Sequence, residues 1–145
     1  MTRTPTGIHT WLVLWKAARA VETRAHESIG HTGLGATDFA VLEALLHKGP
    51  LPVNTLGRKL LLTSGSITTA VDRLEDKGLV SRADDPNDRR VRVVELTREG
   101  RKLIVPAFAR HEKDLEQAVS ALTPRERTTL VNLLRKLGKG AELQK

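Results

Sequence analysis

Apolar residues recur at helical spacing along most of the chain, so the sequence predicts a largely helical protein. The predicted helices cover residues 8–29, 36–48, 52–60 and 64–77, followed by a long helix after Thr97 and a last helix from Thr123-Pro124. In the fourth helix Ile67, Val71 and Leu74 form one stripe that must face a core. Pro106 falls inside the long helix and is expected to kink or divide it.

Two shorter stretches between the fourth and fifth helices have the composition of β-strands. They cover residues 79–83 and 91–96, and the turn-forming sequence DDPNDRR joins them. A hairpin that follows a short helix-turn-helix segment is the layout of a winged helix-turn-helix fold. The sequence therefore predicts a mainly α fold with a small β-hairpin wing.

The two ends of the chain carry more apolar surface than one small winged lobe can cover. We expect an N-terminal dimerisation helix in residues 1–34, a DNA-binding lobe in 35–100 and C-terminal dimerisation helices in 101–145, within one compact domain overall. This organisation predicts a homodimer. The alternative is that the terminal helices pair within one chain.

Composition narrows the class of protein. The 145 residues carry a net charge of +7, which favours a polyanionic partner, although many basic proteins bind no nucleic acid. Cysteine is absent, which excludes disulfides and thiolate metal sites. No apolar stretch approaches the roughly 20 residues of a membrane span, and the N-terminus lacks the pattern of a signal peptide. We therefore expect a cytoplasmic protein without a membrane partner.

The side of the 64–77 helix opposite its apolar stripe is rich in small hydroxyl residues. Such residues let a helix approach a DNA groove closely and bond base edges or phosphates. The alternative is an ordinary amphipathic helix with a threonine-rich solvent face, where glutamate or lysine is more usual. The predicted DNA-contacting residues of this helix are Ser64, Gly65, Ser66, Thr68, Thr69 and Arg73.

The predicted wing adds Arg82, Arg89, Arg90 and Arg92, with Asp88 beside the tip. An aspartate at this place can hold one guanidinium in a planar, bidentate arrangement. An arginine held in this way can enter a narrow minor groove, where the negative potential of DNA is strongest. The alternative is a surface hairpin with local ion pairs of little energetic value.

The stretch TSGSITTAVDRLEDKGLVSRADDPNDRRVRVVELTREG closely resembles the MarR family of bacterial transcriptional regulators. The shared features are the Asp-x-Arg motif at Asp88 and Arg90 and the ending Leu-Thr-x-x-Gly at residues 96–100. The resemblance implies a homodimer on a pseudo-palindromic operator whose half-sites lie about 10 bp apart. It makes Arg90 the first candidate for minor-groove insertion and Arg89 the second. The chain departs from the family at Leu60-Leu61-Leu62, where a glycine is common and a leucine at positive φ would be strained.

In this family a small ligand binds between the dimerisation helices and the DNA-binding lobe. The segment from Thr37 to Thr68 resembles members that repress genes for aromatic or quinone detoxification. The expected effector is therefore a small aromatic, phenolic or quinone-like molecule. Tryptophans at helical spacing are more often packing residues than ligand contacts. The candidate ligand-binding residues are Trp11, Trp15, Phe39, His47 and Phe108.

No pattern in the sequence indicates catalysis. The five histidines are scattered and have no metal-binding spacing, and neither a phosphate loop nor a nucleophile with its base is recognisable. We therefore expect no enzyme activity, no metal and no cofactor. The function predicted is a sequence-specific transcriptional repressor that its ligand releases from the operator. Two alternatives are a ligand-binding dimer whose winged domain binds protein, and a nonspecific architectural DNA binder.

Overall fold

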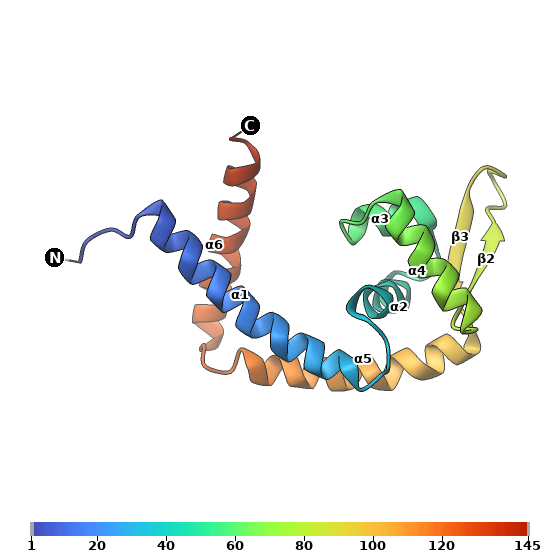
Figure 1. The fold of residues 1–145 in the computed structure, drawn as a ribbon, viewed down its shortest axis with the longest axis horizontal. Coiled ribbons are helices and arrows are strands. Elements are labelled where there is room, and N and C mark those ends of the chain that lie inside the picture. Colours follow the sequence, from blue (N-terminus) through green and yellow to red (C-terminus); the bar gives the residue numbers. More distant parts are fainter. Residues whose placement is uncertain (1, 145) are drawn as a thin grey trace.

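The computed structural model describes residues 2–144 and is largely helical (Figure 1). Its helices are α1 (Gly7–Gly30), α2 (Ala36–Lys48), α3 (Val53–Lys59), α4 (Ser64–Asp76), α5 (Arg98–Ala118) and α6 (Pro124–Glu142). Its strands are β1 (Leu51–Pro52), β2 (Val80–Asp84) and β3 (Arg92–Leu96). The mainly α fold with a small wing is confirmed, and the predicted bounds of helices and strands agree with the structure to within about a residue.

Threonine side chains start most of the helices. Thr63 caps α4 by accepting a hydrogen bond from the Ser66 N–H at 3.1 Å, and Thr97 caps α5 through the Gly100 N–H at 3.0 Å. Thr123 forms a capping box with Glu126 at the start of α6, in which each side chain accepts from the other's backbone N–H. These local signals explain why the sequence locates the helix starts so closely.

The winged lobe gathers α2, α3, α4 and the sheet around one hydrophobic core. The sheet is antiparallel in the order β1-β3-β2, so β3 lies at its centre. The core also takes in Ile29 and Leu34 before the predicted lobe of residues 35–100 and Ile104 after it. The largest fully buried side chains are Phe39, Leu42, Leu45, Leu56, Ile67, Leu74 and Ile104. Residues 1 and 145, which the expected end ranges include, lie outside the described residues.

Strand β1 was not expected from the sequence. It has two residues, and Leu51 pairs with Val94 while Pro52 pairs with Val93. Two residues are too few to show an alternating pattern, and Pro50 and Pro52 indicate a turn or a helix start. Proline is tolerated here because β1 is an edge strand, where a missing N–H costs no ladder hydrogen bond.

Pro106 does not divide α5, which runs without a break from Arg98 to Ala118. The proline is exposed, so the carbonyl that loses its hydrogen bond can be solvated by water. On either side of it Ile104 is fully buried and Ala107 packs against the core, which holds both halves of the helix in place.

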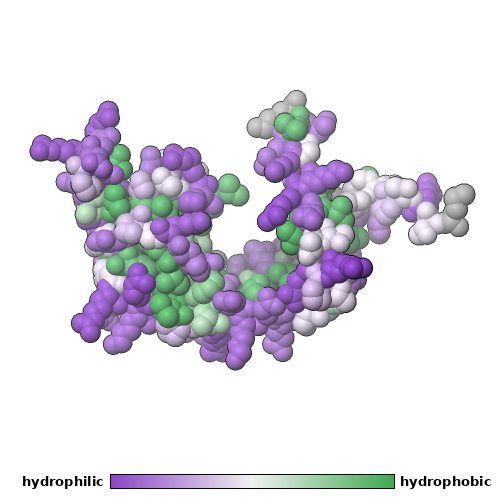
Figure 2. All heavy atoms as spheres, turned by 180° about the vertical axis from the view of Figure 1, so that it is seen from behind, coloured by the Kyte–Doolittle hydropathy of each residue, from purple (hydrophilic) through white to green (hydrophobic). Residues whose placement is uncertain are grey.

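The two ends of the chain form an arm beside the lobe (Figure 1). Helix α1 packs along α5, and the buried Ser28 hydroxyl donates to the Asp114 carboxylate at 2.7 Å. Helix α6 turns away from α5 and buries none of its residues within residues 2–144. Apolar side chains therefore gather on the surface of the arm, as Figure 2 shows.

The turn between α3 and α4 keeps a residue at positive φ although a leucine stands there. Leu61 has a φ of 55°, and its side chain is 93% exposed. We expect Leu61→Asn to raise the free energy of unfolding by roughly 0.5–1 kcal/mol, because asparagine tolerates the left-handed region and little packing is lost. Urea denaturation at a fixed protein concentration measures this change. Leu60→Asn is the control, since Leu60 packs against the core at negative φ and its loss should destabilise. A Leu61→Asn protein less stable than the wild type would contradict the assignment of strain.

Candidate nucleic-acid interface

Helix α4 presents two different sides. Ile67, Val71 and Leu74 are buried as predicted. The residues of the opposite side are exposed, and they include Ser64, Gly65, Ser66, Thr68, Thr69, Asp72 and Arg73. Gly65 has no atom within 4 Å of where a Cβ would lie, so this part of the helix is open to a close approach from outside. The side that the sequence predicts to face DNA is therefore exposed to solvent.

Arg73 is a DNA contact in the sequence prediction, but its guanidinium is engaged within the chain. It donates from Nε and Nη2 to the Asp38 carboxylate at 3.2 and 2.8 Å. Asp38 lies in the first turn of α2 and is buried. This bidentate pair raises the pKa of Arg73 through its hydrogen bonds and charge. Arg73 thus ties α4 to α2, and half of its side chain remains exposed.

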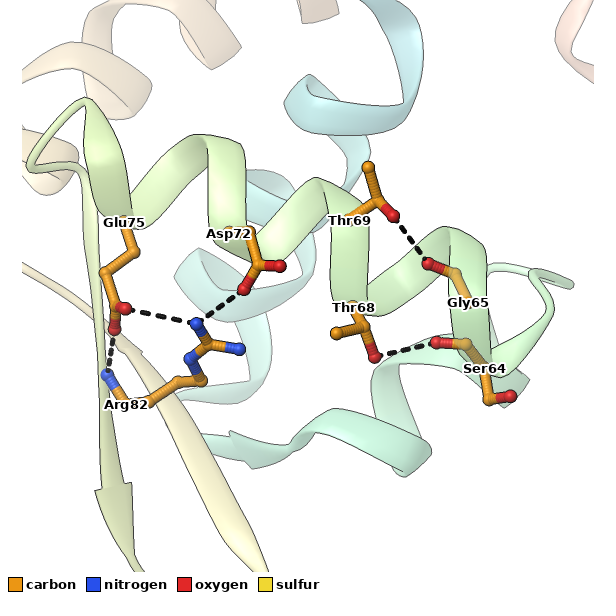
Figure 3. A network of polar contacts seen from close by, with 7 residues as sticks. All are labelled: Ser64, Gly65, Thr68, Thr69, Asp72, Glu75 and Arg82. Atoms are coloured by element: carbon orange, nitrogen blue, oxygen red, sulfur yellow. Dashed lines mark hydrogen bonds and ion pairs between the residues drawn. The ribbon is translucent and has the colours of Figure 1, made fainter.

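Arg82 is held in a similar way, which the sequence prediction of a DNA contact did not anticipate. Its guanidinium donates to Asp72 at 2.5 Å and to Glu75 at 3.1 Å, and its backbone N–H donates to Glu75 at 3.1 Å (Figure 3). Hydrogen bonds from Arg82 lower the pKa of Glu75. Only 21% of the Arg82 side chain is exposed. Arg82 thus joins β2 to α4, and its single positive charge is shared between the two carboxylates of Asp72 and Glu75.

The tip of the wing has the arrangement that the sequence predicts for Asp88 and Arg90. The Arg90 guanidinium donates from Nε to Asp88 Oδ1 at 3.1 Å and from Nη2 to Oδ2 at 3.3 Å. The Arg90 backbone N–H also donates to Oδ1 at 3.0 Å. These hydrogen bonds lower the pKa of Asp88, so the pair stays ionised at neutral pH. The Arg90 side chain is 89% exposed, which leaves an oriented guanidinium projecting from the protein.

The other wing arginines lie close to this tip. Arg89 is exposed next to Arg90, and Arg92 pairs with Asp84 across the hairpin at 3.5 Å. An open hollow of about 600 Å³ separates α4 from the wing, and Arg82, Arg90 and Arg92 line it. The hollow is also lined by Asn54 of α3, a polar residue that sequence reasoning missed. A single asparagine in the first turn of a short helix gives no pattern that could have marked it.

Comparison with known proteins identifies the protein family of this chain. The MarR family model matches residues 34–91, a range that contains α4 and the wing tip. The HTH-type transcriptional regulator MhqR of Bacillus subtilis is 37% identical to the chain over 139 residues, which cover 96% of both proteins. The chain belongs to the MarR family. It is therefore a DNA-binding transcriptional regulator of the winged-helix type and not an enzyme.

Solved structures of other MarR-family members agree with this. A MarR variant from Escherichia coli complexed with operator DNA has a TM-score of 0.78 and 27% identity, over 86% of this chain and 90% of that one. Bordetella bronchiseptica BpsR, whose DNA binding is regulated by 6-hydroxynicotinic acid, has a TM-score of 0.77 and 27% identity, over 89% of this chain and 98% of its own. The fold that carries α4 and the wing is thus one that binds operator DNA in a relative.

The five residues predicted to bind a ligand fall into three sets in this MarR-family chain. His47 and Phe108 meet edge to face with ring centroids 4.5 Å apart, at the contact between α2 and α5. Phe39 packs in the same way on His111 but is only 1% exposed, so it serves as a core residue. Trp11 and Trp15 are exposed in the N-terminal half of α1. One protomer therefore does not bring all five together.

The remaining expectations concern metals and membranes. Across residues 2–144, no three His, Asp or Glu side chains gather in a way that could hold a metal ion. None of the helices in that range combines the length and the apolar character that a membrane span requires.

Proposed function

We propose that this MarR-family regulator is a homodimeric repressor that binds a pseudo-palindromic operator and leaves it when a small aromatic, phenolic or quinone-like ligand binds. The observation that carries the proposal is the pairing of an open, small-residue side of α4 with an exposed guanidinium that Asp88 holds in a fixed orientation. The proposal places the protein in the compartment that holds the chromosome, which is the cytoplasm in bacteria.

The DNA contacts follow from the shape of the interface. The exposed side of α4 fits a major groove, where the hydroxyls of Ser64, Ser66 and Thr69 reach base edges or phosphates. The oriented guanidinium of Arg90 then enters the adjoining minor groove, where the potential is most negative. Arg89 and Arg92 lie close enough to the tip to contact the phosphates on either side of that groove. Arg82 and Arg73 position the wing and α4, because their own charges are engaged by carboxylates.

The arm supports the homodimer. The exposed apolar residues of α1 and α6 have no partner element in the described chain that covers them, and an isolated surface of this kind is unusual for a monomer. They recur at helical spacing, so each helix presents one continuous stripe. A second copy related by a twofold axis would bury both stripes and set the two α4 helices at a fixed separation. The α1 stripe contains Ile8, Trp11, Leu12 and Trp15, and the α6 stripe contains Leu130, Leu133, Leu134 and Leu137.

We expect Leu133→Asp to convert the dimer into a monomer at micromolar concentration. Leu133 is 57% exposed in one protomer, so its replacement costs little in the isolated chain but buries a charge in the dimer. Sedimentation velocity measures the change. Asn132→Asp adds the same charge on the other side of α6 and should leave the dimer intact. If Leu133→Asp kept the wild-type sedimentation coefficient, as Asn132→Asp is expected to, the α6 stripe would not be the dimer interface.

The ligand part of the proposal draws on the aromatic pair at the contact of α2 and α5 and on the relative that responds to 6-hydroxynicotinic acid. His47 and Phe108 lie where the lobe meets the arm, so a ligand wedged there would shift α2 against α5. We expect an aromatic acid or quinone that quenches the fluorescence of the two tryptophans also to lower operator affinity. A compound that quenches the tryptophan fluorescence without lowering operator affinity would show that its binding near Trp11 or Trp15 does not regulate DNA binding.

Titration against DNA tests the proposal as a whole. The probes are the DNA upstream of the protein's own gene and a scrambled duplex of equal length, each at several salt concentrations between about 50 and 200 mM. A sequence-specific regulator should prefer one upstream site by about 10³-fold or more and should weaken with salt on both probes. Salt-dependent binding without preference would indicate an architectural protein. Absence of salt-dependent DNA binding would indicate a winged domain that binds protein.

A further inference from the structure

Thr68 and Thr69 lie next to each other on the exposed side of α4, and the hydroxyl groups of both already donate a hydrogen bond. Thr68 Oγ1 donates to the Ser64 carbonyl at 2.7 Å, and Thr69 Oγ1 donates to the Gly65 carbonyl at 2.9 Å (Figure 3). A carbonyl oxygen can only accept, so the direction of these bonds is fixed. A hydroxyl has a single hydrogen, so each Oγ1 can offer an outside partner only its lone pairs. The methyl groups of the two threonines complete the exposed surface.

No lysine or arginine lies in the first nine residues of α4, from Ser64 to Asp72. Arg73 is the only lysine or arginine between Ser64 and Asp76, and Asp38 holds it through two hydrogen bonds. In the major groove guanine presents only acceptors, N7 and O6, and its usual reader is a free arginine or lysine. The part of α4 that contains Thr68 and Thr69, from Ser64 to Asp72, therefore has neither a threonine donor nor a lysine or arginine to offer a guanine edge.

Adenine and thymine match what the two threonines present. The N6 amino group of adenine is a donor that a hydroxyl lone pair can accept, and the C5-methyl group of thymine makes apolar contact with a threonine methyl. We propose that Thr68 and Thr69 read A·T base pairs in each half-site, as lone-pair acceptors and methyl contacts, and that they disfavour guanine. This inference rests on the proposed function, because it assigns the base preference of the operator that α4 would bind.

Selection of binding sites from a random duplex pool tests the inference. The proteins compared are the wild type, Thr69→Val, which keeps the shape but has no lone pairs, and Thr69→Ser, which keeps the lone pairs but has no methyl group. Thr23→Val is the matched control, since Thr23 also donates to a carbonyl within a helix, at 2.9 Å, but lies on α1. Base pairs whose preference differs between the wild type and Thr69→Val are the pairs that Thr69 reads.

We expect those pairs to be A·T in the wild-type selection. Thr69→Val should lose about two- to tenfold of the discrimination against G·C there, which is the size of one net hydrogen bond. Replacing the thymine with uracil should weaken wild-type binding about fourfold, the value of one buried methyl group, and should leave Thr69→Ser unaffected. Thr23→Val should select the same site as the wild type.

Two results would overturn the inference alone. The first is that the wild type selects G·C at the base pairs where its preference differs from that of Thr69→Val. The second is that Thr69→Val selects the same sequence as the wild type, with the same preference at every base pair. If the wild type enriched no particular sequence from the pool, the proposed function would be overturned, and so would this inference.

Discussion

Replacing Gly100 with alanine is expected to lower the free energy of unfolding by about 3 kcal/mol, the upper end of the range for overpacking. A Cβ at this position would lie 1.9 Å from the Leu79 carbonyl oxygen and 2.9 Å from its carbon. That carbonyl accepts from the Thr97 N–H at 3.1 Å, and the Thr97 hydroxyl donates to the Gly78 carbonyl at 2.6 Å. Alanine must therefore separate the start of α5 from the residues that lead into β2.

Urea denaturation at a fixed protomer concentration measures the effect of Gly100→Ala, because the apparent stability of a dimer depends on concentration. Gly65→Ala is the control. It lies within α4, away from the proposed dimer stripes, has no atom within 4 Å of the new Cβ, and should be neutral or raise stability by up to about 1 kcal/mol. Equal stability of Gly100→Ala and the wild type would contradict the close approach of α5 to Leu79.

Replacing Arg90 with alanine is expected to weaken operator binding by roughly 1–3 kcal/mol while the dimer stays intact. The side chain is exposed, so its loss removes no packing, and the contact with Asp88 shows that its orientation is set before DNA arrives. Asp88→Asn should produce a smaller loss, because the guanidinium keeps its charge but loses its bidentate partner. Fluorescence anisotropy with labelled operator measures both changes.

Arg98→Ala is the matched control for the wing tip. Arg98 is an exposed arginine in the first turn of α5, so its removal changes the net charge equally and should alter affinity only through general electrostatics. Similar losses for Arg90→Ala and Arg98→Ala would show that Arg90 acts as one more positive charge and not as a groove-inserting residue.

The features that the sequence predicted well depend on residues close together in the chain. Helix starts follow from threonine caps, the buried stripe of α4 follows from a 3.6-residue period, and the contact between Asp88 and Arg90 spans only two residues. The turn at Leu61 was less predictable, because the sequence indicated only that a leucine at positive φ would be strained, and Leu61 nevertheless adopts a φ of 55°.

The features that the sequence did not reveal depend on tertiary contacts. Arg73 and Asp38 are 35 residues apart, and nothing in either local pattern predicts their meeting. Arg82 looked like a free wing cation because its partners Asp72 and Glu75 lie on a different element. Aromatic residues at helical spacing could not be divided by sequence into a core residue such as Phe39 and exposed ones such as Trp11. Strand β1 exists only because β3 lies beside it.

The operator identified by the upstream-DNA titration allows a direct test of the paired interface. Two protomers related by a twofold axis should present their α4 helices to major grooves about one helical turn apart. Inserting 5 bp at the centre of the operator turns the half-sites to opposite faces of the duplex, so affinity should fall to the level of scrambled DNA. Affinity unchanged by the insertion would mean that each protomer binds its half-site independently, and would contradict the account.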